Sequence, residues 1–137
     1  MTTYHGSCDC GAVKFDCVLD NPASAIVCHC ENCKIRNGVF ASVLAVPEDK
    51  FSITSGADKL TKYSYPGDSG NPVPIFFCSI CGTTVFKEPV SMAGMKIVLA
   101  GTLNKAWFSG EVKPTAFVYG NEKFDWVSTE GLKNLQA

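Results

Sequence analysis

Seven of the eight cysteines in the chain fall into three closely spaced groups. The groups are Cys8-x-Cys10, Cys28-x-Cys30-x-x-Cys33 and Cys78-x-x-Cys81, and Cys17 stands apart from them. A tetrahedral zinc ion takes sulfur ligands at ~2.3 Å, and one tight turn of the chain can supply two of them. Close pairs of this kind, in a chain without an evident secretory signal, indicate metal binding or redox chemistry rather than structural disulfides.

The seven clustered cysteines divide into a set of four and a set of three. A closed four-sulfur site is typical of structural zinc, whereas three protein ligands leave the open fourth position of a catalytic zinc. One division is a zinc ribbon formed by Cys30, Cys33, Cys78 and Cys81. The other closes one site with Cys8, Cys10, Cys78 and Cys81. It leaves an open site formed by Cys28, Cys30 and Cys33. The spacing alone does not choose between these divisions.

Length and composition indicate one globular domain over residues 1–137, with 46% hydrophobic and 18% charged residues. The net charge is −1, and the lysines and arginines are scattered, which argues against nucleic acid or an anionic membrane as the main partner. No apolar run approaches the ~20 residues needed to cross a bilayer, and the amino end lacks the features of a signal peptide. We therefore expect a cytoplasmic protein, with the nucleus as the alternative compartment.

Alternating apolar residues dominate the chain and predict a mainly β fold with little helix. Val13, Phe15 and Cys17 share one face of an expected strand, on which Cys17 packs into the core, while Lys14 and Asp16 take the other face. A spacing of about ten residues between such runs, with turn formers between them, favours antiparallel sheets. The predicted strands are 13–17, 25–28, 39–46, 51–54, 60–65, 74–78, 83–86, 95–100 and 116–119.

The best helix candidate starts near Cys30 and ends at Gly38. It would place Cys30 and Cys33 on one face, where the helix amino end lowers the pKa of a thiol. Lys34 and Arg36 would act in the same direction. A second short turn is expected at 128–135, and the polar stretch 65–74 is expected to form an exposed or mobile loop.

Other residues near the cysteines have more than one interpretation. His29 lies between two cysteines and is a candidate for orienting a ligand or substrate, and Glu31 and Asp68 are chemically suitable bases, although nothing in the sequence selects either. Six aromatic residues of the carboxy-terminal third are expected mostly in the core, with one or two walling a substrate pocket. They are Trp107, Phe108, Phe117, Tyr119, Phe124 and Trp126. The pattern His29-x-Glu31 with Cys78-x-x-Cys81 echoes zinc nucleobase deaminases, but residue 77 is Phe rather than Pro and helices do not alternate with strands.

The cysteine groups lie within three longer runs. These are Gly6-Ser-Cys-Asp-Cys-Gly-Ala-Val, Cys28-His-Cys-Glu-Asn-Cys-Lys-Ile-Arg-Asn-Gly and Phe77-Cys-Ser-Ile-Cys-Gly-Thr-Thr-Val-Phe. In this order they resemble the glutathione-dependent formaldehyde-activating enzyme family, which also includes centromere protein V. The resemblance extends from about Gly6 to Val127. It implies a β-tent of antiparallel sheets, a structural zinc at Cys8, Cys10, Cys78 and Cys81, and a catalytic zinc at Cys28, Cys30 and Cys33. The chain departs from the family in having Phe117 where members often carry a histidine after the late proline.

The resemblance also implies a function, namely the reversible combination of glutathione with formaldehyde, a detoxification reaction, or more broadly carbon–sulfur lyase chemistry. The open zinc would accept the sulfur of a small thiol, such as glutathione or its adduct, because metal binding favours the thiolate. A non-enzymatic zinc-stabilised binding or scaffold module is the alternative, as is glutathione binding without turnover. The sequence does not indicate an oligomeric state.

Overall fold

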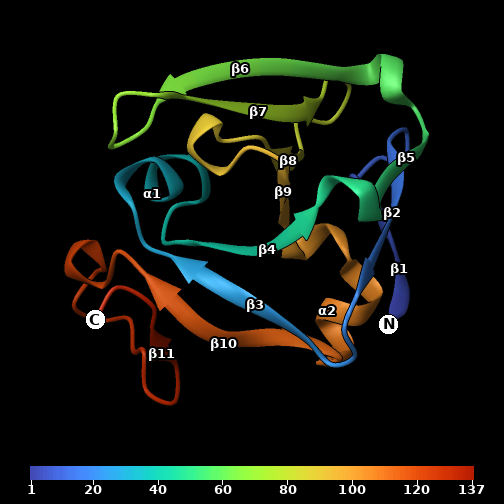
Figure 1. Cartoon of the computed structure of the whole chain (residues 1–137). Helices are drawn as coiled ribbons and strands as arrows, with labels where there is room; N and C mark the ends of the chain where they lie inside the picture. Colours follow the sequence, from blue (N-terminus) through green and yellow to red (C-terminus); the bar gives the residue numbers. More distant parts are fainter.

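The computed structural model describes residues 1–137 and contains two β-sheets joined by short helices (Figure 1). The smaller sheet has the order β1 (Thr2–Ser7), β2 (Lys14–Leu19) and β5 (Phe51–Ser55). The larger sheet has the order β11 (Lys133–Asn134), β10 (Val112–Val118), β3 (Ala23–Cys28), β4 (Ala41–Pro47), β9 (Met95–Leu99), β8 (Thr84–Lys87), β7 (Pro72–Cys78) and β6 (Leu60–Pro66). The mainly β, antiparallel fold predicted from alternating residues is confirmed.

Strand β10 departs from this antiparallel pattern. It pairs in parallel with β3, from Val112 opposite Ala23 to Val118 opposite Cys28, and in parallel with the short β11. A parallel pair needs a crossover connection, because the chain must return to the same end of the sheet before the second strand starts. Here the long stretch between β3 and β10 makes that return. Both strands therefore end at the same edge, beside the three-cysteine group.

Two α-helices interrupt the strands, and only the first was predicted. Helix α1 spans Glu31–Asn37 and ends at Gly38, whose φ of 91° is unfavourable for residues with a Cβ. Helix α2 (Asn104–Ser109) was missed because its aromatic residues suggested core packing and its six residues are too few to show a helical period. Short 3-10 turns lie at Glu48–Lys50, Ala57–Lys59, Val90–Met92, Ala100–Thr102 and Gly120–Glu122.

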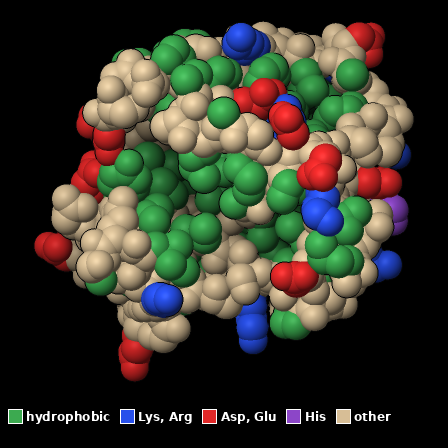
Figure 2. Space-filling view, in the orientation of Figure 1, with side chains coloured by type: hydrophobic (Ala, Val, Ile, Leu, Met, Phe, Trp, Pro, Cys, Tyr) green, Lys and Arg blue, Asp and Glu red, His purple; other side chains and the backbone are tan.

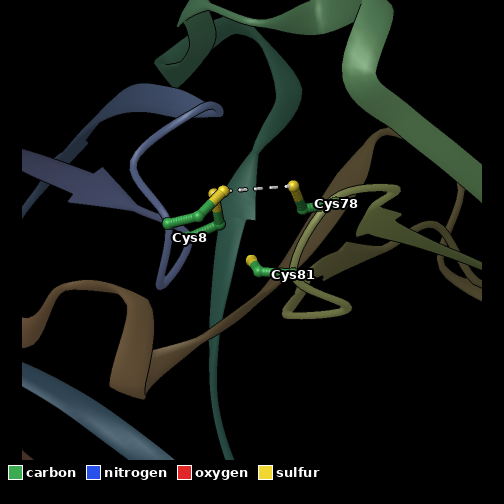
Figure 3. Close-up of side chains that lie close together, drawn as sticks. Cys8, Cys78 and Cys81 are labelled. Carbon is green, nitrogen blue, oxygen red and sulfur yellow. Dashed lines mark hydrogen bonds between the residues drawn. The ribbon is translucent and has the colours of Figure 1, made fainter.

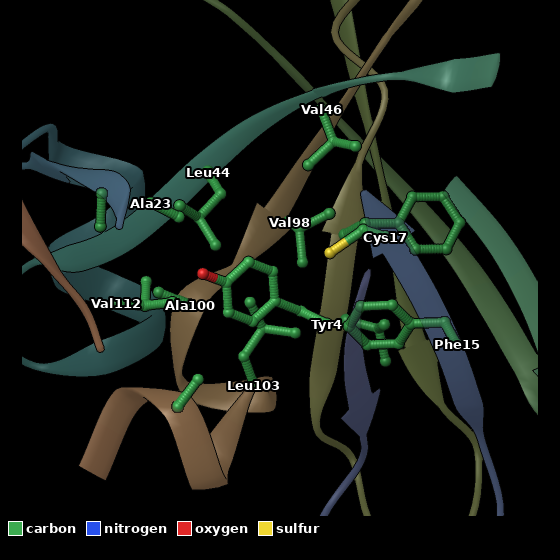
Figure 4. Packing of buried hydrophobic residues seen from close by; sticks show 14 of the residues in the cluster. Tyr4, Phe15, Cys17, Ala23, Leu44, Val46, Val98, Ala100, Leu103 and Val112 are labelled. Carbon is green, nitrogen blue, oxygen red and sulfur yellow. The ribbon is translucent and has the colours of Figure 1, made fainter. Parts of the chain in front are cut away.

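The main core lies between the two sheets and joins residues from nearly all strands (Figure 4). Phe15 and Cys17 of β2 are fully buried in it, and Phe51 of β5 stacks on Phe15 with ring centroids 5.1 Å apart. Leu103 and Val112 extend the core under α2. Cys17 therefore packs as a small apolar residue, as expected from its place in the alternating pattern.

The predicted loop at 65–74 and the predicted turn at 128–135 both differ in extent from what the structure shows. Strands β6 and β7 pair along their whole length, with Leu60 opposite Cys78 at one end and Pro66 opposite Pro72 at the other. The hairpin loop is therefore residues 67–71, which is shorter than the predicted loop of 65–74. Within 128–135, the chain turns and then adds β11 to the edge of β10, where the Leu135 amide donates to the Phe117 carbonyl at 3.1 Å. None of the helices has the length and apolar character that a membrane span requires.

Candidate metal centres

The first cysteine group joins the turn after β1 to the turn after β7. The four sulfurs all lie within 4.8 Å of one another. Those of Cys8, Cys78 and Cys81 point toward one shared space (Figure 3), and the Cys10 sulfur lies 3.7 Å from both Cys8 and Cys78. Four converging sulfurs match the ligand set of a closed tetrahedral zinc site. The structure thus separates this group from Cys30 and Cys33, and the zinc-ribbon division is not found.

The surrounding backbone and side chains donate hydrogen bonds to these sulfurs. The Val13 amide lies 3.3 Å from the Cys8 sulfur, and the Ile80 amide lies 3.4 Å from the Cys78 sulfur. The Thr83 hydroxyl lies 3.2 Å from the Cys81 sulfur and, with the Thr83 backbone, lowers the pKa of that thiol to about 5. Such partners favour the thiolate form, which is the form that binds metal.

The second cysteine group is built at the junction of β3 and α1. Cys28 ends β3, Cys30 is the N-cap of α1, and Cys33 lies in the first helical turn. Their three sulfurs lie within 4.8 Å of one another, and no fourth His, Cys, Asp or Glu ligand joins them. Cys33 is buried, whereas Cys28 and Cys30 are half-buried. Three such sulfurs could hold a metal ion and would leave one coordination position for another ligand.

Hydrogen bonds within this group make its three thiols unequal. The pKa of Cys30 is lowered to about 2, first by hydrogen bonds from the Cys28 and Cys33 thiols and further by the Cys33 amide, which lies 3.4 Å from the Cys30 sulfur. The pKa of Cys28 is raised by its hydrogen bonds to Cys30 and Cys33 and by burial. The Cys30 sulfur lies at the N-cap of α1, where helix geometry favours an anion.

A cavity of about 320 Å³ opens beside this group. Its walls come from the first turns of α1, the end of β6, the 67–71 hairpin and the segment after β10. The lining residues are Cys30, Glu31, Asn32, Ile35, Tyr65, Pro66, Gly67, Asp68, Tyr119 and Glu122. Figure 2 shows that hydrophobic side chains gather in a hollow over α1 and the strands beside it, with charged groups around them. A small molecule in the cavity would lie next to Cys30.

Tyr119 contributes a fixed polar wall to this cavity. Its φ of 56° lies in the left-handed region, which is unfavourable for a residue with a large side chain. The backbone amide of Tyr119 donates to Oε1 of Gln136 at 2.7 Å. A hydrogen bond with Asp68, followed by burial, raises the pKa of the Tyr119 hydroxyl. Among the aromatic residues considered from the sequence, Tyr119 is the one that lines the cavity.

His29 lies close to the cysteines in sequence but points away from them. Its side chain is 1% exposed and packs edge-on against Phe40 and Phe117, with ring centroids 5.6 and 6.3 Å away. Neither ring nitrogen has a hydrogen-bond partner, and burial, with the positive charges of Lys123 and Lys34, lowers the pKa of the ring. His29 is therefore outside the groups of atoms that could hold a metal ion.

Lys34 and Arg36, which were expected to lower the pKa of the thiols, make their contacts elsewhere. Lys34 donates to the Glu122 carbonyl, and Arg36 lies over the Tyr63 ring, 5.4 Å from its centroid. Lys87 of β8, which the sequence did not single out, contacts the Cys33 sulfur at 3.7 Å and the Tyr65 hydroxyl at 3.4 Å. No local signal marks Lys87, because a lysine at the end of a strand is normally exposed.

The fold and its cysteines define a class of protein: a small β protein with two candidate metal centres, one with four cysteine ligands and one with three. Comparison with known families is more specific, since residues 3–122 match the family described as glutathione-dependent formaldehyde-activating enzyme. The chain belongs to this family, as its three cysteine runs indicated.

Similar individual proteins include one from yeast and one from a bacterium. The chain is similar to an uncharacterised lyase of Schizosaccharomyces pombe, with 26% identity over 87 residues. The match covers 63% of the chain and 58% of the yeast protein, so the chain spans little more than half the length of this relative. It is also similar to the crystal structure of a Rhodobacter sphaeroides protein from structural genomics, with a TM-score of 0.63 and 27% identity. That match covers 81% of the chain and 99% of the bacterial protein, which supports the same fold.

Proposed function

We propose that the protein is a zinc-dependent, carbon–sulfur lyase-type enzyme that acts on a thiol adduct, such as S-hydroxymethylglutathione. The observation that carries the proposal is the three-cysteine group, which offers an incomplete ligand set beside a cavity of small-molecule size. The family description supports glutathione and formaldehyde as the substrate pair, and the similar yeast protein is described as a lyase. A cytosolic location suits such a substrate, because glutathione is the main thiol buffer of that compartment.

The donor set fits zinc at both groups. Cys8, Cys10, Cys78 and Cys81 would hold a structural zinc that ties the turns together. Cys28, Cys30 and Cys33 would hold a second zinc with one free position. Bound there, zinc would supply a site that favours the thiolate form of a substrate sulfur and stabilises negative charge on a nearby oxygen.

The reaction consists of the formation or cleavage of one carbon–sulfur bond and the transfer of one proton. In the forward direction the thiol sulfur attacks the aldehyde carbon, a carbon–sulfur bond forms, and the sulfur proton ends on the former carbonyl oxygen. The reverse direction breaks the same bond and returns the proton to sulfur. The cavity wall offers the Asp68 carboxylate as a proton acceptor and the Tyr119 hydroxyl as a donor, because both residues line the same cavity. We assign the proton transfer to this pair.

Exchange NMR tests the proposal directly. With ¹³C-formaldehyde and glutathione, the protein should accelerate exchange between free aldehyde and S-hydroxymethylglutathione above the uncatalysed rate. A Cys33→Ser variant should lose this acceleration while keeping its fold. Cys17→Ala, which removes a cysteine outside both groups, should retain it. Wild-type protein that binds zinc at both groups but gives no acceleration with glutathione or other small thiols would contradict the proposal and favour a binding or scaffold role.

A further inference from the structure

Lys87 is buried without a carboxylate partner. Its exposed fraction is 6%, and none of the three ion pairs in the structure includes it. Burying an ammonium is costly unless other groups replace the lost water. The groups that surround its Nζ are the Cys33 sulfur at 3.7 Å, the Tyr65 hydroxyl at 3.4 Å and the Tyr65 ring, whose centroid is 5.6 Å away. Two of these three contacts are neutral, so a negative sulfur is the partner that would compensate the charge.

We propose that Lys87 is a positioning residue of the three-cysteine centre: its buried ammonium contacts the Cys33 sulfur and offsets the negative charge that this group carries when it binds a metal ion. Hydrogen bonds to charged groups are stronger than those between neutral groups, so an ammonium beside Cys33 stabilises a metal-bound, negatively charged sulfur more than a neutral one. The Cys30 sulfur has a comparable donor in the Cys33 amide, whereas no group outside the cluster donates to Cys28. The inference rests on the proposed metal site and does not depend on which reaction occurs there.

The sign of the effect follows from the charge of the site. Three protonated thiols are neutral, whereas three thiolates with a divalent zinc carry a net charge of −1. A fixed positive charge beside Cys33 therefore stabilises the loaded form relative to the empty form. A substrate thiolate in the open position would bring the formal charge of the metal-loaded centre to −2, and the ammonium of Lys87 would offset one unit of it. Lys87 should thus favour both retention of the metal and entry of an anionic sulfur.

Substitutions at residue 87 separate charge from packing. Lys87→Met removes the charge and keeps an unbranched side chain, while Lys87→Arg keeps the charge. Lys96→Met is a matched control, because Lys96 in β9 lies over the Phe86 ring at 5.3 Å but contacts no cysteine. The affinity of the open site for zinc can be measured by competition with a chromophoric chelator on protein whose closed site stays loaded. Cobalt substitution adds an independent readout through its sulfur charge-transfer bands.

We expect Lys87→Met to bind zinc at the open site ~10-fold more weakly, in the range usual for loss of a partner behind a metal ligand. Its cobalt bands should shift, whereas Lys87→Arg should retain most of the affinity and Lys96→Met all of it. If Lys87→Met does not fold, Lys87→Gln gives the same comparison, because its amide is neutral. Unchanged or tighter zinc binding in a folded neutral variant would overturn the inference, as would a wild-type open site that binds no metal. Zinc-loaded wild type without lyase activity would contradict the proposed function alone.

Discussion

Replacing Gly6 by alanine should disturb the core behind the first cysteine group. A Cβ at this position would lie 2.1 Å from Cζ of Phe15, below the 3.0 Å that Cβ contacts in real structures respect. The Phe15 ring would have to retreat by about 1 Å, but it is fully buried. Phe51 stacks on it at 5.1 Å and packs in turn on Phe86 at 5.0 Å. Gly6 is therefore needed for this close approach of an aromatic ring.

The expected cost is about 3 kcal/mol, the upper part of the range for overpacked cores. For a domain of this length that loss corresponds to a fall in Tm of ~10 °C. Urea unfolding of zinc-loaded protein, followed by circular dichroism, gives the free energy of unfolding. Gly101→Ala is the control, because a Cβ there meets no atom within 4 Å and the stability should hardly change.

A double-mutant cycle with Phe15→Leu distinguishes a clash from a general loss of flexibility. The smaller side chain leaves room for the new methyl group, so the two substitutions together should cost less than the sum of their separate effects. Additive costs, or a Gly6→Ala protein within about 0.5 kcal/mol of wild type, would refute the steric reasoning.

Three further predictions concern the cysteines and the cavity. Elemental analysis should find two zinc ions per wild-type chain and one in Cys33→Ser, because only the open group loses a ligand; equal metal content in both would contradict the assignment. Tyr119→Phe should keep both metals yet slow adduct exchange, since the hydroxyl that faces the cavity is lost; full activity would remove Tyr119 from the proton path. Burial, with a smaller effect of Asp16, raises the pKa of the Cys17 thiol from 9.0 to about 11, so the folded state holds this proton more tightly than the unfolded state. The contribution of the Cys17 thiol to the free energy of unfolding should therefore be complete below pH 9 and be lost as the pH rises to about 11. Urea unfolding of wild type and Cys17→Ala over this pH range tests this, because the free energy of unfolding of the variant should fall less with pH.

Local sequence patterns predicted the parts of the fold that local forces determine. Alternation placed Phe15 and Cys17 in the core, and a terminal glycine marked the end of α1 within one residue. The grouping of cysteines came from the family resemblance, because sequence spacing alone left two divisions open. The alternation and the helix end could be predicted because each is encoded within a few consecutive residues, which is the range over which side-chain periodicity carries information.

Features that depend on distant partners could not be predicted in this way. The parallel pairing of β10 with β3 is set by where the chain returns after α2, and no local pattern encodes it. The burial of Lys87 depends on Tyr65 from β6 and Cys33 from α1, neither of which is near it in sequence. The sequence suggests His29 only as a residue that orients a ligand or substrate, and the enclosure of its ring by Phe40 and Phe117 likewise depends on residues distant in the sequence.

The four-cysteine group also has a consequence for how the chain folds. Cys10 and Cys78 are separated by 68 positions, so a metal bound by both closes a long loop of the unfolded chain. In the chain-entropy description, a permanent link over such a distance is worth about 4 kcal/mol. During synthesis this link cannot form until Cys81 has left the ribosome, several seconds after Cys8 at ~5–20 residues per second. An isolated hairpin of β1 and β2 is at best marginally stable in water, so in that interval the amino-terminal cysteines have neither their metal partners nor a stable sheet to hold them in place.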